Sequence, residues 1–113
     1  MARGLLIALA VGFTLTGCGI SADTYSSNRE VLRGSPQLRA QSLQTCTRNQ
    51  AAKPLATRQN LAKLMNVSVS AAPRTLCRRI SSGITSGRLT HADVDAGMKG
   101  RMTPNLVRVI QGR

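Results

Sequence analysis

The sequence predicts a small all-α protein: a bundle of about four short helices, braced by one disulfide, after a flexible N-terminal tether. Its 113 residues are enough for one domain. Phe13 and Tyr25 are the only aromatic residues, so the core must be aliphatic, which favours packed helices over an aromatic-rich sheet. After residue 34, apolar residues recur at helical spacing between recognisable helix start and stop signals.

The first 17 residues have the features of a cleavable export signal. Arg3 gives a short positive start, and residues 5–15 form an uncharged stretch. That stretch is too short to span a bilayer, which needs about 20 apolar residues. The next four residues, Leu15-Thr16-Gly17-Cys18, resemble the lipobox of bacterial lipoproteins, where small residues and a cysteine mark the cleavage site. The alternative is an ordinary secretory signal followed by a chance cysteine.

The lipobox resemblance implies that residues 1–17 are removed and that Cys18 carries a diacylglyceryl group. Acylation of the freed amine then adds a further chain, which matters because one chain alone is a marginal anchor. Gly19 occupies the position where Asp often signals retention in the inner membrane, so the resemblance favours the outer membrane. We therefore expect a lipid-anchored protein of the cell envelope.

Residues 18–34 are predicted to comprise the lipidated cysteine and a flexible tether. The segment after Cys18 is polar and rich in Ser, Asp and Asn, a composition typical of linkers. At most one turn of helix is expected, at residues 28–33. The tether would hold the domain away from the lipid surface.

Residues 35–113 are predicted to form the helical domain. Ser35-Pro36 is a typical helix start, with serine as the cap and proline at the first helical position, and the helix is expected to reach about residue 52. A second helix is expected from residue 55 or 58 to residue 66, because its leucines recur at helical spacing.

The third predicted helix has the clearest pattern. Ser70 can cap it, Pro73 lies in its first turn, and Gly87 suits its end. Its apolar stripe follows helical spacing and comprises Leu76, Cys77, Ile80 and Ile84.

Two short elements complete the predicted domain. Thr90 and Asp93 have the spacing of a capping box, with Asp in place of the usual Glu, so a helix is expected to start there. Thr103-Pro104 can start a last element over residues 105–111, which could be a helix or an edge strand.

Cys46 and Cys77 remain as a pair once Cys18 is assigned to the lipid. An exported chain enters an oxidising compartment, so a disulfide between them is expected. The enclosed loop of about 30 residues predicts a stabilisation of about 3–4 kcal/mol. The alternative, a redox-active pair, lacks the Cys-x-x-Cys spacing that such thiols usually show.

The charge is strongly basic: 16 Lys and Arg against four Asp and Glu give a net charge of +12. Such a balance predicts attraction to anionic partners. The alternative is a genome composition that favours arginine wherever a solvated cation is acceptable. The residues expected to contact an anionic partner are Arg74, Arg78, Arg79 and Arg88.

Little in the sequence points to catalysis. His91 and Asp95 lie four residues apart on one predicted helix, but two ligands do not define a metal site. We interpret them as exposed residues of the first helical turn. The four carboxylates include no paired catalytic acids, so neither an enzyme nor a cofactor is expected.

These observations predict a membrane-anchored basic interaction or accessory module. Its partner would be an anionic lipid, a polysaccharide or an envelope protein. The export signal and the lack of aromatic stacking residues argue against a nucleic-acid partner. The alternatives are a purely structural envelope lipoprotein and a small membrane-active effector.

Overall fold

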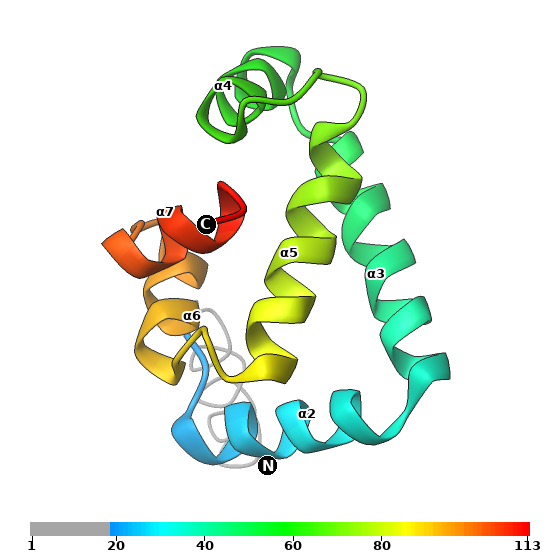
Figure 1. Cartoon of the computed structure of the whole chain (residues 1–113), viewed down its shortest axis with the longest axis vertical. Helices are drawn as coiled ribbons and strands as arrows, with labels where there is room; N and C mark the ends of the chain where they lie inside the picture. Colours follow the sequence, from blue (N-terminus) through cyan, green and yellow to red (C-terminus); the bar gives the residue numbers. More distant parts are fainter. Residues whose placement is uncertain (1–18) are drawn as a thin grey trace, which may run out of the picture.

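The computed structural model describes residues 19–113, which form six helices and no strand (Figure 1). The all-α prediction is confirmed, whereas the expected number of about four helices is too low. The predicted export signal and the predicted lipidation site Cys18 lie outside the described residues. No helix within residues 19–113 is both long and apolar enough to span a membrane. The helices are α2 (Ala22–Gly34), α3 (Pro36–Ala51), α4 (Leu55–Met65), α5 (Ala72–Ser86), α6 (His91–Met98) and α7 (Pro104–Ile110).

Local caps explain why several helices begin where the sequence predicts. The Ser35 hydroxyl accepts a 3.1 Å hydrogen bond from the Leu38 amide at the start of α3. Thr90 and Asp93 form the expected capping box at the start of α6. The Thr103 hydroxyl caps α7, so the last predicted element is a helix, over Pro104–Ile110, and not an edge strand. Such caps satisfy amides that have no partner within the helix.

The start of α5 differs slightly from the prediction, whereas its end agrees with it. Ser70 does not cap the helix; the hydroxyl of Ser68 accepts a 3.2 Å hydrogen bond from the Ala71 amide just before α5. Gly87 ends α5 as predicted and has φ of 83°, a left-handed conformation that glycine adopts without steric cost.

Residues 22–34 form α2, so the prediction of a flexible tether over this segment is wrong. Ser21 caps the helix through a 3.1 Å hydrogen bond from the Thr24 amide. Tyr25 is buried, and its hydroxyl donates a 2.6 Å hydrogen bond to the carbonyl of Leu89. The polar composition suggested a linker, but a contact to a residue 64 positions away holds the helix in place.

The core lies among α4, α5, α7 and the loop before α6. Leu89 and Ile110 are its largest fully buried side chains. Gly83 allows α5 to approach this loop, because a Cβ atom there would lie only 2.8 Å from the Leu89 side chain. The other buried members of the cluster are Ala62, Met65, Ala72, Leu76, Leu106 and Val109.

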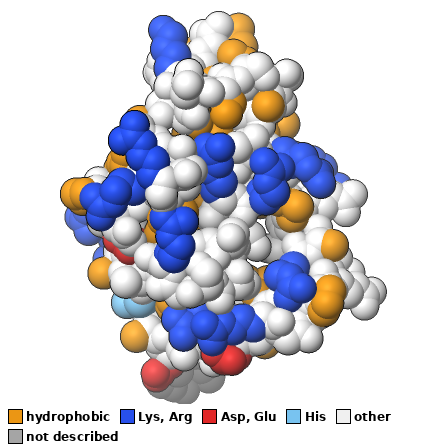
Figure 2. All heavy atoms as spheres, viewed as in Figure 1, with side chains coloured by type: hydrophobic (Ala, Val, Ile, Leu, Met, Phe, Trp, Pro, Cys, Tyr) orange, Lys and Arg blue, Asp and Glu red, His pale blue; other side chains and the backbone are white. Residues whose placement is uncertain are grey.

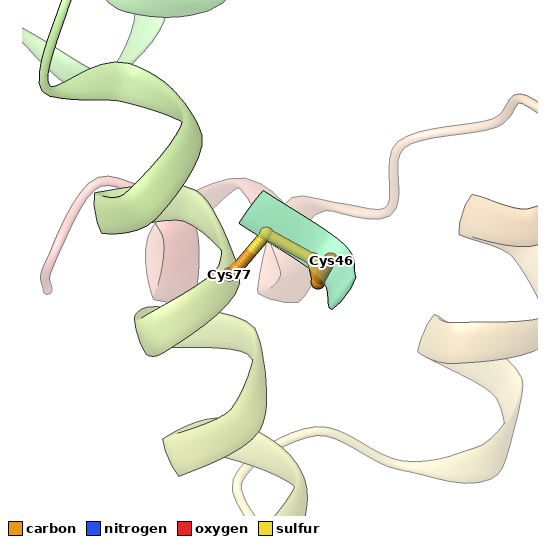
Figure 3. The surroundings of a disulfide bond; sticks show 2 residues. All are labelled: Cys46 and Cys77. Atoms are coloured by element: carbon orange, nitrogen blue, oxygen red, sulfur yellow. A yellow bond between two sulfur atoms is a disulfide. The ribbon is translucent and has the colours of Figure 1, made fainter. Parts of the chain in front are cut away.

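Helix α3 lies beside α5 but contributes nothing fully buried over Pro36–Ala51. A disulfide between Cys46 and Cys77 joins the two helices (Figure 3). Its S–S length is 2.06 Å and its Cα atoms lie 5.9 Å apart, which is ordinary disulfide geometry. The predicted disulfide is therefore confirmed, and it is the covalent link between α3 and the half of the molecule that contains the core.

Candidate functional site

The residues that follow Cys18 are attached to the first turns of α6. The Ile20 amide donates a 2.9 Å hydrogen bond to Oδ1 of Asp95. The Ile20 carbonyl is within hydrogen-bonding distance of Nε2 of His91. Gly19 lies so close that a Cβ atom would be 2.6 Å from the Asp95 carboxylate. We call His91 and Asp95, with the Ile20 backbone that they hold, the N-terminal clamp.

The clamp carboxylate is stabilised in its ionised form. Lys99 Nζ lies 2.9 Å from Oδ2 of Asp95, one turn along the chain. The hydrogen bond from Lys99 and the one from the Ile20 amide hold the pKa of Asp95 below its ordinary value. Asp95 therefore remains a negatively charged acceptor for the Ile20 amide at neutral pH.

The clamp corrects the interpretation of His91 and Asp95 as exposed residues of a helical turn. Both are half-buried, and both are occupied by a backbone segment more than 70 positions earlier in the chain. Within residues 19–113, no group of three or more His, Cys, Asp or Glu side chains is placed to hold a metal ion. Their shared helix face was visible in the sequence, but their partner Ile20 was not.

Asp93 joins the starts of α6 and α7. Its carboxylate accepts hydrogen bonds from the Thr90 amide at 3.0 Å, from the Thr103 hydroxyl at 2.6 Å and from the Asn105 side-chain amide at 2.7 Å. Burial alone would raise the pKa of Asp93, but these hydrogen bonds outweigh burial and lower the pKa to about 2. The sequence predicted the capping box but not the bonds to α7.

Two of the four arginines predicted to bind an anionic partner contact backbone carbonyls at or just after the end of α7. Arg79 Nη1 donates a 2.7 Å hydrogen bond to the Ile110 carbonyl, and Arg88 Nη2 contacts the carbonyl of Arg113. Cations at a helix C-terminus stabilise its unpaired carbonyls. Arg74 and Arg78 are exposed. Arg88 is exposed as well, so Arg79 is the one member of the predicted set that is partly buried.

The charges are distributed unevenly along the helices. All four carboxylates lie in α2 and α6, the two helices that hold the N-terminal segment. Figure 2 shows Lys and Arg side chains over most of the visible face, with the few acidic ones in its lower half. No Asp or Glu occurs in α3, α4, α5 or α7, which together carry eight basic residues: Arg39, Arg48, Arg58, Lys63, Arg74, Arg78, Arg79 and Arg108.

None of these eight cations forms an ion pair within residues 19–113. Within residues 19–113 the structure forms two ion pairs, Arg33 with Glu30 and Lys99 with Asp95. Both pairs lie in or next to α2 and α6, the helices that contain the carboxylates. The surface of α3, α4, α5 and α7 therefore presents unpaired positive charge to solvent.

Comparisons of the chain with protein-family models, curated proteins and solved structures find no match.

Proposed function

We propose that the chain is a bacterial lipoprotein, anchored through Cys18, whose helical body is a non-enzymatic basic module. It binds an anionic component of the cell envelope or an acidic face of a partner protein. The observation that carries the proposal is that all four carboxylates lie in α2 and α6, whereas the other four helices carry eight basic residues and no carboxylate.

The N-terminal clamp gives this anchor a short reach. Cys18 precedes Ile20 by two residues, a span of about 7 Å at full extension. Ile20 is fixed to α6, and α2 begins at Ala22. A lipid on Cys18 would thus hold the end of the body that contains the four carboxylates against the membrane, and α4, the basic helix farthest from α2, would face away from it.

This orientation predicts that the partner lies opposite the anchoring membrane. An anionic bilayer surface attracts basic residues by about 1 kcal/mol for each Lys or Arg near it, within a Debye length. The basic helices would bind, through this attraction, an anionic surface on the side of the protein opposite the anchoring membrane.

A vesicle-tethering experiment tests the proposal. The lipoprotein is extracted from membranes, and its intact mass shows whether Cys18 is acylated and residues 1–17 are lost. It is then reconstituted into zwitterionic vesicles and mixed with labelled target vesicles. Targets containing phosphatidylglycerol should be tethered at low salt and released at high salt, whereas zwitterionic targets should remain free.

Either of two results would contradict the proposal. An unacylated, full-length chain extracted from membranes would remove the anchor. Equal tethering of anionic and zwitterionic targets would mean that the positive charge has no binding role, as a purely structural lipoprotein predicts. A variant carrying Arg74→Gln and Arg78→Gln should tether anionic vesicles less than the parent protein does.

A further inference from the structure

A groove between α3 and α5 combines fixed and exposed arginines with hydroxyl groups. It has a volume of about 290 Å³ and is open to solvent. Arg39 lines it from α3, and Arg78, Ser81 and Ser82 line it from α5. We call these four residues the arginine–serine groove.

The spacing of α5 brings its three groove residues to one face. Positions three and four apart are neighbours on a helix surface, so Arg78 lies next to both Ser81 and Ser82. Cys77 precedes Arg78 and is bonded to α3, which fixes the distance between the two walls. The groove is therefore built by the same covalent link that attaches α3.

Arg39 is held in position before any ligand arrives. Its Nη1 donates hydrogen bonds to the carbonyls of Leu32 at 2.7 Å and Arg33 at 2.9 Å. One edge of the guanidinium is therefore fixed to the end of α2, and the remaining N–H groups are available as donors. A side chain already ordered in this way loses less conformational entropy on binding than a free one.

The groove keeps its positive charge because its walls contain no carboxylate. Helices α3 and α5 lack Asp and Glu, and the nearby Glu30 is paired with Arg33 at 3.1 Å. Arg33 in turn donates from Nε to the Thr85 carbonyl at 2.8 Å. Neither Arg39 nor Arg78 takes part in an ion pair within residues 19–113.

We propose that the arginine–serine groove binds a phosphate monoester group. Guanidinium groups match the geometry of phosphate oxygens, and charge-assisted hydrogen bonds to them are stronger than neutral ones. The two serine hydroxyls supply further donors for the remaining oxygens. The proposal rests on the basic module described above and names the chemical group that it recognises.

The first test measures the binding of inorganic phosphate to the full lipoprotein in detergent micelles by calorimetry, at constant ionic strength. The parent protein should give saturable binding. Arg78→Gln should weaken it about tenfold, the effect expected for losing one charge-assisted contact. Ser81→Ala combined with Ser82→Ala should weaken it by a smaller factor without changing the net charge.

Arg74→Gln is the matched control. Arg74 is exposed on α5 one turn before Arg78 and does not line the groove. Its replacement by Gln removes the same charge as Arg78→Gln does. The affinity of the Arg74→Gln variant for phosphate should stay within about twofold of the parent value. Equal losses for Arg74→Gln and Arg78→Gln, or no saturable binding by the parent protein, would overturn the phosphate site.

Vesicle tethering distinguishes a lipid phosphate from a soluble one. It also separates the phosphate site from the basic module proposed above. Tethering of phosphatidic acid vesicles that Arg78→Gln weakens more than Arg74→Gln does would identify a lipid head group as a ligand. Arg78-dependent binding of inorganic phosphate alone would identify a soluble phosphate. If phosphatidylglycerol vesicles are tethered but both variants behave alike in every assay, the basic module stands and the phosphate site is wrong.

Discussion

At the scale of single residues, Asp93 shows how one carboxylate can connect two helices. It completes the capping box of α6 and accepts hydrogen bonds from Thr103 and Asn105 of the α7 start. These hydrogen bonds stabilise the ionised form of Asp93 in the folded protein. The free energy of unfolding therefore depends on pH through this carboxylate.

We expect the protein to lose stability in acid through Asp93. Its pKa is about 2 when folded against an ordinary value of 3.8, so ionisation favours the folded state above pH 4. That contribution, about 2 kcal/mol, is lost as the pH falls from about 4 towards 2. Denaturant unfolding measured across this range should show a weaker pH dependence in Asp93→Asn than in the parent.

The exposed carboxylate of Asp23, in the first turn of α2, gives the control for this experiment. Asp23→Asn should keep the acid-dependent loss of stability. An unchanged pH profile in Asp93→Asn would show that the network around Asp93 does not stabilise its charge.

Gly83 is a residue at which a side chain would be harmful despite a helical backbone. A Cβ atom would lie 2.8 Å from Leu89 and 3.0 Å from Val109, both of which are buried in the core. Gly83→Ala should therefore lower the free energy of unfolding by about 1–3 kcal/mol through overpacking. Gly34→Ala, at a helical site with open space around it, should be neutral or stabilising by up to about 1 kcal/mol. Thermal unfolding of both variants would check this contrast.

At the scale of helices, α3 depends on its connections more than on burial. Sixteen residues of helix contain no fully buried side chain. The helix is held by the Cys46–Cys77 bond, by Arg39 and by partly buried side chains such as Leu43. Helices α4, α5 and α7, in contrast, share the apolar cluster.

Loss of the disulfide should therefore affect α3 before the core. Cys46→Ser combined with Cys77→Ser should lower the free energy of unfolding by about 4 kcal/mol, from the entropy of a loop of 31 residues. Hydrogen exchange should show early loss of protection in α3. Protection in α7 should persist under mild conditions, and simultaneous loss in both helices would contradict this view.

How far the sequence predicts these helices depends on whether their signals are local. The caps Ser35, Thr90 and Thr103 were predictable because each acts on amides within three residues of itself. Helix α2 was missed because its polar composition resembles a linker and its stabilising partner Leu89 is distant. A local signal did exist, since Ser21 is a cap residue and Tyr25 and Leu32 lie seven positions apart on one face.

The candidate site was less predictable than the fold. Basic composition indicated an anionic partner, but Arg79 and Arg88 could not be distinguished from Arg74 and Arg78 without the position of the α7 end. Likewise, His91 and Asp95 share a face in sequence, but their contact with Ile20 exists only after folding.

At the scale of the whole molecule, the described chain is more open than a compact domain of its size. Its radius of gyration is 16.1 Å, whereas a compact domain of 100 residues has about 13 Å. The longest dimension is 55 Å. Helices α4 and α2 lie at opposite ends of this longest dimension, and α3 and α5 run between them (Figure 1).

The N-terminal clamp should restrain the chain next to Cys18. Asp95→Ala removes the acceptor of the Ile20 amide, so that amide should exchange with solvent at least about tenfold faster. Lys99→Gln, which leaves the acceptor in place, should change this rate much less. Hydrogen exchange of the Ile20 amide, measured at single-residue resolution, would test this prediction. Equal rates in the parent and Asp95→Ala would rule out the clamp.

The cross-link between α3 and α5 makes the finished shape conditional on where the chain is. In a reducing compartment Cys46 and Cys77 would stay as thiols, and α3 would not be cross-linked to α5. Such a loosely assembled precursor is easier to thread through a narrow export channel than a locked one. Under the export proposed above, the Cys46–Cys77 bond would form only after the chain reaches an oxidising compartment, so completion of the fold would follow export.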